Sequence, residues 1–246
     1  MAKFAGPVRA ALKRVGVSIR RASVAHAPDW MKRSLGPIFS HFDMLFIDHG
    51  IFRVIYLNKH KIADKDGWRA AQPAPHQIWG LKRSGIKTIV NLRGERLCGS
   101  YWLETAACAR HGIKLENFQV RSRAAPTQKE LHGARELFQR IEYPMLMHCK
   151  SGADRVGMMS VLFLHVRHGW PIEKALGQLS LKYGHIRQAD TGVLDHFFET
   201  YLAYNSQTPI DFYDWVDTVY DPAEVRESFN ANSFANRLVN SILRRE

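Results

Sequence analysis

The sequence has few cysteines and no long apolar run. Three cysteines in 246 residues are too few for a disulfide framework, and such a low number favours a reducing compartment. The apolar segment 44–57 is too short to cross a membrane and is interrupted by Asp48, His49 and Arg53. The N-terminus also lacks the uninterrupted apolar core of a secretory signal. We therefore expect a cytoplasmic protein, and this length suits one folded core with extensions.

Acidic residues are scarce relative to basic ones. The chain has 35 Lys and Arg against 23 Asp and Glu, which gives a net charge of +12. Such an excess implies anionic partners. No nucleic-acid-binding module is recognisable, and the basic residues do not alternate with exposed aromatic residues. We therefore expect a phosphorylated substrate or an anionic membrane as partner, and no nucleic acid.

The first 34 residues are the most basic part of the chain and contain a single acid, Asp29. At 100° per residue, one helical face carries five apolar side chains and the opposite face is basic; the apolar residues are Phe4, Val8, Leu12, Val15 and Ile19. Three interpretations stay open. The helix can lie on an anionic membrane, dock its apolar face on the catalytic domain, or serve as an organellar targeting peptide.

The most informative feature is the run His-Cys-Lys-Ser-Gly-Ala-Asp-Arg at 148–155. The apolar segment 143–147 before it predicts a buried strand, and 156–166 after it predicts a helix. A strand–loop–helix turn directs backbone N–H groups inward at the positive end of a helix dipole, which suits a phosphate dianion. The same field favours the thiolate of Cys149 as nucleophile, and the planar guanidinium of Arg155 can hold two phosphate oxygens. The run therefore predicts phosphoryl transfer to a cysteine.

The predicted elements alternate between strands and helices. Strands are expected at 68–71, 87–92, 113–120 and 143–147, and helices at 75–83, 102–110, 127–141, 156–167, 171–183 and 190–204. This pattern predicts an α/β domain with a mixed, largely parallel sheet of four to five strands, flanked by helices. The nucleophile would lie at the carboxyl end of its strand, where such sheets bind ligands. We divide the chain into a basic helix (1–34), a strand or helical lead-in segment (35–64), the catalytic domain (65–205) and a polar, partly helical extension (206–246).

The run 148–155 resembles the His-Cys-x5-Arg signature of the cysteine-dependent protein tyrosine and dual-specificity phosphatase superfamily. The segments 68–73 (Trp-Arg-Ala-Ala-Gln-Pro) and 85–93 are similar to the opening of its atypical branch found in bacteria and fungi, so the resemblance spans about 65–205. It implies a dual-specificity phosphatase-like fold and a phosphomonoester hydrolase without metal or cofactor. In such enzymes the cysteine (here Cys149) attacks phosphorus, the arginine (Arg155) holds the phosphate, and an aspartate protonates the leaving group. The phosphate-binding loop would then comprise His148, Lys150, Ser151, Gly152 and Ala153.

The expected proton donor is missing from its usual place. Family members carry an aspartate on a mobile loop about thirty residues before the cysteine, whereas 113–147 contains no Asp. The corresponding loop carries Arg121 and Arg123, and Thr127 to Glu130 forms a predicted capping box, which makes Glu130 structural. Asp154 remains, at the place where myotubularin-type and Sac-type phosphoinositide phosphatases also carry an aspartate. It can donate a proton if the dianion beside it keeps it protonated; alternatively it holds the loop in shape.

Two further points concern catalysis. An acid from the C-terminal stretch, which contains Asp211, Asp214, Asp217 and Asp221, stays open. Many relatives have Ser or Thr directly after the arginine, where the hydroxyl helps the cysteine to leave, but this chain has Val156. We therefore expect slow hydrolysis of the phosphocysteine unless Ser151 or Ser160 compensates.

The substrate is predicted less sharply. Phosphotyrosine on protein is the default that the resemblance implies. Lys150 in the loop, Arg121 and Arg123 above it, and a basic rim of His185 and Arg187 favour a membrane phospholipid instead, such as phosphatidylglycerol phosphate or a phosphoinositide, hydrolysed at the inner face of a membrane. An inactive phosphate-binding module would not need both Cys149 and Arg155, and a rhodanese-type sulfurtransferase fits His148 and Gly152 less well.

Overall fold

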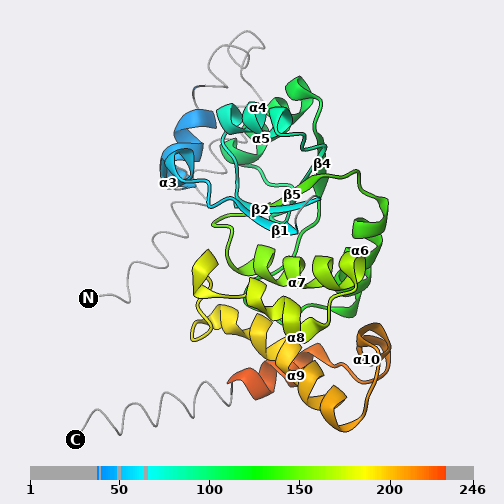
Figure 1. The fold of residues 1–246 in the computed structure, drawn as a ribbon. Helices are drawn as coiled ribbons and strands as arrows, with labels where there is room; N and C mark the ends of the chain where they lie inside the picture. Colours follow the sequence, from blue (N-terminus) through cyan, green and yellow to red (C-terminus); the bar gives the residue numbers. More distant parts are fainter. Residues whose placement is uncertain (1–37, 39, 49–50, 64–65, 231–246) are drawn as a thin grey trace, which may run out of the picture.

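Five strands form one mixed sheet in the computed structural model, which describes residues 38, 40–48, 51–63 and 66–230 (Figure 1). The strand order is β1-β2-β5-β3-β4. The strands are β1 (His60–Ala63), β2 (Gly67–Ala71), β3 (Thr88–Asn91), β4 (Lys114–Asn117) and β5 (Met145–Cys149). Only β1 and β2 pair antiparallel, whereas β2·β5, β5·β3 and β3·β4 are parallel. The predicted mixed, largely parallel sheet of four to five strands is confirmed; β1 is an edge strand that the sequence pattern did not indicate.

The central strand β5 brings the motif to one edge of the sheet. All five of its residues are buried between β2 and β3, which explains the continuous apolar run that precedes the cysteine. Ala71 of β2 is in register with Cys149, and Asn91 of β3 is in register with His148. The segments that follow these three strands therefore meet at the carboxyl edge of the sheet.

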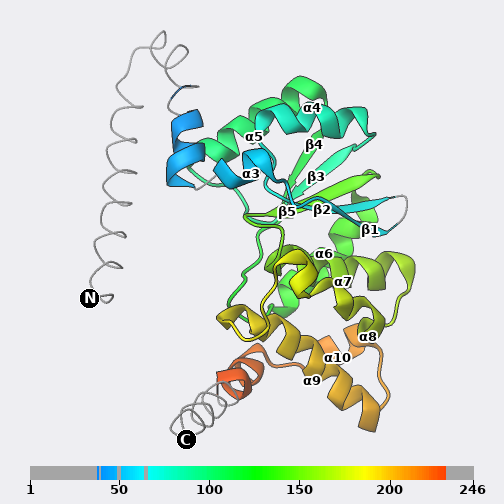
Figure 2. The same ribbon diagram turned by 60° about the vertical axis from the view of Figure 1, so that its left-hand side comes forward.

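Helices cover both faces of the sheet (Figures 1 and 2). Helices α4 and α5 lie on one face, α6 and α7 lie on the other, and α8, α9 and α10 stack beyond α7. The helices are α3 (Ile51–Ile55), α4 (Pro75–Arg83), α5 (Gly99–His111), α6 (Gln128–Arg140), α7 (Asp154–His168), α8 (Ile172–Ala175), α9 (Val193–Gln207) and α10 (Phe212–Thr218), with shorter turns at η1 (Asp43–Ile47), η2 (Leu176–Gln178), η3 (Leu181–Tyr183) and η4 (Asp190–Gly192). Two apolar cores result, a small one under α4 and α5 and a large one on the α7 side.

Two sequence-based predictions need correction. The helix expected over 171–183 ends at Ala175 and continues as the short turns η2 and η3. The C-terminal extension is not a polar tail in its first part, because Phe212, Trp215 and Val216 of α10 are buried in the large core. The predicted basic helix at 1–34 lies outside the described residues. None of the helices within the described ranges is long and apolar enough to cross a bilayer.

Candidate active site

The loop between β5 and α7 curves into a cradle whose carbonyls are held by side chains of other segments. Cys149, 2% exposed, ends β5, and Asp154 begins α7. Three consecutive loop carbonyls are held from outside: Ser151 O accepts from Asn58 Nδ2 at 3.0 Å, and the oxygens of Gly152 and Ala153 accept from Arg69 Nη2 at 2.9 and 3.0 Å. Because the N–H of a peptide unit points opposite to its C=O, carbonyls held outward turn the N–H groups inward. These N–H groups and the N-terminus of α7 can bind an anion together.

Gly152 is required by the shape of this loop. Its φ is +80°, in the left-handed region, and a Cβ there would lie 2.7 Å from Ala70 C and Ala71 N. A side chain is therefore excluded by both backbone conformation and close packing against β2.

Arg155 closes the cradle on the other side. Its Nη1 donates to Leu92 O at 3.5 Å. Burial lowers the pKa of Arg155, the neighbouring Cys149 opposes that shift, and Arg93 and Arg96 add to it. The guanidinium that would hold a phosphate thus lies beside the cysteine, with two further arginines close enough to contribute to the positive field.

Arg69 is a site residue that the sequence analysis did not single out. Its side chain is fully buried, and besides the two loop carbonyls its Nη1 donates to Gln178 O at 2.7 Å and to Gln178 Oε1 at 2.9 Å. The guanidinium stacks 3.9 Å above the centre of the Tyr183 ring. Burial lowers its pKa to about 10, against the opposing charges of Tyr183, Cys149 and Asp154. An arginine within a buried strand was the available signal, because an arginine that is buried needs partners for its donors.

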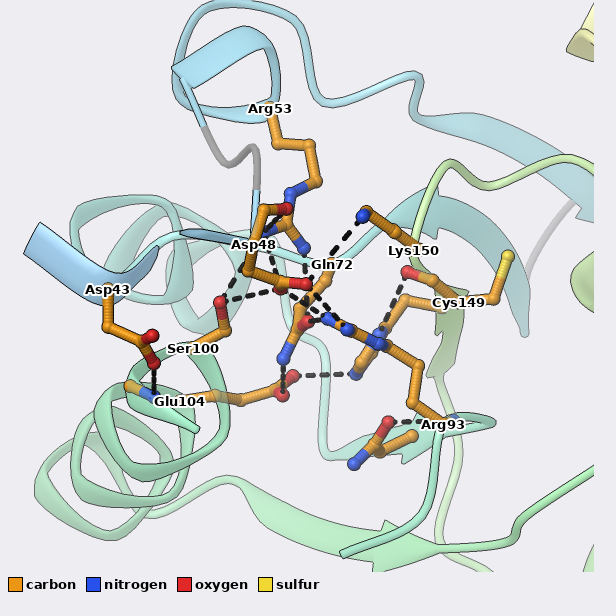
Figure 3. Close-up of polar contacts among 12 residues, drawn as sticks. Asp43, Asp48, Arg53, Gln72, Arg93, Ser100, Glu104, Cys149 and Lys150 are labelled. Atoms are coloured by element: carbon orange, nitrogen blue, oxygen red, sulfur yellow. Dashed lines mark hydrogen bonds and ion pairs between the residues drawn. The ribbon is translucent and has the colours of Figure 1, made fainter. Parts of the chain in front are cut away.

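A buried polar network lies beside Cys149 (Figure 3). His148 Nε2 and Glu104 Oε1 form an ion pair at 2.6 Å, and both side chains are fully buried. Glu104 Oε2 accepts from Gln72 Nε2 at 2.7 Å. Gln72 Oε1 in turn accepts from Arg53 Nη1 at 3.0 Å and from Arg93 Nη1. His148 is therefore held by Glu104 of α5, and Gln72 of the segment after β2 in turn holds Glu104.

The lead-in segment reaches this network through Asp48. Its carboxylate binds Arg93 through both oxygens, at 2.6 and 2.8 Å, and accepts from Arg53 at 2.9 Å and Ser100 Oγ at 2.8 Å. Lys150 Nζ lies 3.8 Å from the same carboxylate. Burial alone would raise the pKa of Asp48, but Arg93 and Arg53 hold it well below the ordinary carboxyl range. Asp48 is therefore a permanent carboxylate and not a proton donor, and it draws Lys150 toward the lead-in segment.

Asp154 points toward a buried histidine. Asp154 Oδ1 lies 2.8 Å from His185 Nδ1, and Asp195 Oδ2 lies 2.6 Å from His185 Nε2. Burial alone would lower the pKa of His185, but hydrogen bonds to the two carboxylates raise it to about 9. His185 is 1% exposed, so it is not part of a basic surface rim as the sequence suggested.

The comparisons with known proteins agree with the motif. Residues 54–192 match the family described as DSP-PTPase phosphatase fused to NAD+ kinase. The chain belongs to this family. The predicted membership in the dual-specificity phosphatase superfamily is confirmed, and the chain is a cysteine-dependent phosphoric monoester hydrolase.

Several solved phosphatase structures are similar to this chain. TpbA of P. aeruginosa has 19% identity over 70% of this chain and 90% of its own, with a TM-score of 0.46. PTPMT1 has 21% identity over 61% of this chain and 99% of its own, with a TM-score of 0.43. The core catalytic domain of the PP-IP phosphatase SIW14 of S. cerevisiae has 18% identity over 65% of this chain and 99% of its own, with a TM-score of 0.46. No curated protein matches the chain.

Other predicted contributors in this phosphatase have partners elsewhere. Arg121 forms an ion pair with Glu130 at 3.5 Å, and the carbonyl of Arg123 accepts from Arg226. The loop that carries both arginines starts beside the cradle, because Val120 N donates to Leu92 O, which also accepts from Arg155. Substrate contacts by Arg121 and Arg123 stay a prediction.

Four of the alternative acids and hydroxyls have partners elsewhere. Glu130 completes the predicted capping box with Thr127, Asp211 caps α10, and Asp217 pairs with His132 at 2.6 Å. Ser160 Oγ donates to Val156 O at 2.7 Å, so it is turned into its own helix and does not replace the missing hydroxyl after Arg155.

Proposed function

We propose that this phosphatase hydrolyses phosphomonoesters through a phosphocysteine formed on Cys149. The observation that carries the proposal is the cradle: Cys149 and Arg155 lie at its two ends, and the carbonyls between them are held outward by Asn58 and Arg69. A loop arranged in this way offers preorganised N–H donors to the equatorial oxygens of a transferring phosphoryl group.

The first half of the reaction transfers the phosphoryl group. The Cys149 thiolate attacks phosphorus, the bond from phosphorus to the leaving oxygen breaks, and that oxygen takes a proton from the Asp154 carboxyl group. Arg155 holds two of the phosphoryl oxygens with its planar guanidinium. The products are the free alcohol or phenol and the phosphocysteine.

The second half regenerates the enzyme. A water molecule attacks phosphorus, the carboxylate of Asp154 takes its proton, and the S–P bond breaks to release phosphate and the thiolate. Val156 supplies no hydroxyl to the departing sulfur, so this half is the slow one.

Phosphotyrosine or phosphoserine and phosphothreonine on proteins are the first substrate class, as for dual-specificity phosphatases in general. A phospholipid monoester, such as phosphatidylglycerol phosphate or a phosphoinositide, is the second candidate, and a specific observation favours it. Asn58 joins the loop at Ser151 O to the turn η3 at Tyr183 O. Beside these contacts Ile55, Tyr56 and Leu181 are 83%, 66% and 76% exposed. Large apolar side chains that stay exposed beside a phosphate site suit insertion among lipid headgroups.

The first experiment measures phosphate release by the purified full chain. The substrates are p-nitrophenyl phosphate, a phosphotyrosine peptide, and phosphoinositides or phosphatidylglycerol phosphate in anionic vesicles. Cys149→Ser should abolish turnover on all of them, and Cys98→Ser is the matched control that should retain it. Turnover by Cys149→Ser above a few per cent would refute the nucleophile, and a silent wild-type protein would favour a phosphate-binding module.

The same panel separates the two substrate classes. Preference for vesicles, lost when Ile55→Glu and Leu181→Glu are combined while p-nitrophenyl phosphate turnover is kept, would support the lipid. A chain without residues 1–34 then tests whether the basic segment contributes to vesicle binding. Preference for the peptide, with no effect of Ile55→Glu and Leu181→Glu, would support the protein substrate.

Asp154→Asn tests the proton donor. Phenyl phosphate has a poor leaving group that needs a proton, whereas p-nitrophenolate leaves with little help. We expect kcat/KM to fall at least about tenfold more for phenyl phosphate than for p-nitrophenyl phosphate. Equal losses on both substrates would make Asp154 a structural residue of the loop.

A further inference from the structure

A buried histidine between two carboxylates adjoins the active-site loop. Asp154 comes from the first turn of α7, directly before Arg155, and its side chain is 24% exposed. His185 is 1% exposed and Asp195, from α9, is 9% exposed. The contacts of 2.8 and 2.6 Å engage both ring nitrogens of His185. An imidazolium satisfies this geometry fully, because both of its nitrogens are donors and both neighbours are acceptors.

We propose that Asp154, His185 and Asp195 form a proton relay that supplies the leaving group, with His185 and Asp195 acting through Asp154 as positioning residues. The inference rests on the proposed function of Cys149 and Asp154. The relay would supply the proton that other family members take from an aspartate on the loop before the cysteine. Residues 113–147 of this chain contain no aspartate.

One proton leaves His185 and returns to it in each catalytic cycle. In the free enzyme His185 is protonated and both carboxylates are charged. A phosphate dianion that enters the cradle makes protonation of the adjacent carboxylate more favourable, so a proton crosses the 2.8 Å from His185 Nδ1 to Asp154. Asp154 then passes it to the leaving oxygen as the P–O bond breaks. In the second half Asp154 receives a proton from the attacking water and returns it to His185.

The outer end of the relay opens to solvent. A cavity of about 290 Å³ is lined by Leu179, Ser180, Leu181, Arg187, His185 and Asp195. Water in this cavity can exchange protons with Asp195 and His185 without passing through the substrate site. The relay can therefore be reset while product still occupies the cradle.

Charged groups face His185 from two helices, α7 and α9. Asp154 faces it from α7 and Asp195 from α9, while Glu199 of α9 is neutralised by Arg187 at 2.7 Å. On the far side of Asp154, Arg69 and Arg155 both act on that carboxylate. Of these groups, His185 is the one that lies between two carboxylates, and its ring can release a proton to Asp154 and take it back.

The test compares kcat/KM on phenyl phosphate and p-nitrophenyl phosphate for His185→Gln and Asp195→Asn in the full chain. For each substrate, kcat/KM reports only the steps up to release of the phenol. Slow hydrolysis of the phosphocysteine therefore does not mask the effect. We expect a loss of at least about tenfold on phenyl phosphate and less than about threefold on p-nitrophenyl phosphate. His196→Gln is the matched control: His196 lies next to Asp195 on α9, but its ring bonds to Ser228, and both activities should stay unchanged.

The pH profile separates a relay from a merely structural role. Asp195→Asn removes a charge that stabilises the imidazolium, so His185 loses its proton at lower pH. The basic limb of the phenyl phosphate profile should then move to lower pH by at least one unit, while p-nitrophenyl phosphate shows no such shift. Equal losses on both substrates, or an unmoved limb, would overturn the relay. Failure of the proposed function is distinguishable, because it would show as a wild-type protein with no turnover or a Cys149→Ser variant that keeps it.

Discussion

Val156 supplies no hydroxyl to the proposed phosphocysteine. It is fully buried directly after Arg155, at a position where a hydroxyl would help the cysteine sulfur to leave. The nearest hydroxyl along α7, on Ser160, is committed to the carbonyl of Val156. In the proposed mechanism no hydroxyl of α7 assists the departure of sulfur, so we expect a slower second half of the reaction and an unaffected first half.

Val156→Thr should therefore raise kcat at an unchanged kcat/KM. Thr has nearly the shape of Val, so the cost is that of placing one hydroxyl in the core, about 1 kcal/mol of stability. Wild-type protein should show a burst of p-nitrophenol equal to one equivalent of enzyme, and the burst should shrink in the variant. Val156→Ala is the control, because it changes volume without supplying a donor. A linear wild-type time course would show that hydrolysis is not the slow step.

The elements with clear periodicity were predicted well, and those fixed by distant partners were not. Helix α4 has the predicted bounds, and α6, β2 and β3 differ from the predicted ranges by one residue at one or both ends. The helix expected over 171–183 ends early, and at that point Gln178 offers its carbonyl and side chain to Arg69, 109 residues away. Those bonds need an irregular backbone, and local propensity carries no information about them.

The buried polar groups escaped prediction for a related reason. Glu104 and His148 look like a surface acid and a motif histidine in the sequence, yet they pair with each other at 2.6 Å inside the protein. The same holds for Asp48, Gln72 and Arg93, which come from three separate segments. A polar residue reveals its burial only when its partner is known, whereas the cradle could be predicted because its residues are contiguous.

Arg69 links two elements to the loop, so its replacement tests the cradle. Arg69→Lys keeps the charge, but one ammonium group cannot reach the carbonyls of Gly152 and Ala153 and both acceptors of Gln178. Misplaced loop N–H groups should lower kcat/KM on p-nitrophenyl phosphate by about 100-fold. Arg135→Lys is a suitable control, because Arg135 also lies over a tyrosine ring, that of Tyr213 at 4.7 Å. Circular dichroism at the assay temperature must show a folded variant, and full activity of that folded variant would contradict the role.

The stability of the whole molecule should depend on pH through two buried ion clusters. The cluster of Asp48 loses its contribution at acidic pH, and the cluster of His185 loses its contribution at alkaline pH. The pKa of Asp48 is lowered in the folded state, so its contribution is present above the ordinary carboxyl pKa of about 4 and is lost as pH falls below it. The pKa of His185 is raised to about 9. Its contribution is therefore complete below the ordinary histidine pKa of about 6.5 and is lost as pH rises to about 9.

The alkaline side gives the sharper prediction. From pH 6.5 to 9 the free energy of unfolding should fall by at most about 3 kcal/mol, which corresponds to the shift of His185. His60 and His196 do not obscure this decrease in the free energy of unfolding. Because burial lowers their pKa values, they affect stability only at pH values below the ordinary histidine pKa. Urea unfolding at intervals across this range measures the slope in wild-type protein, in His185→Gln and in the control His196→Gln. The slope should vanish in His185→Gln and persist in His196→Gln, and a wild-type slope of zero would mean that His185 is neutral and unable to feed the relay.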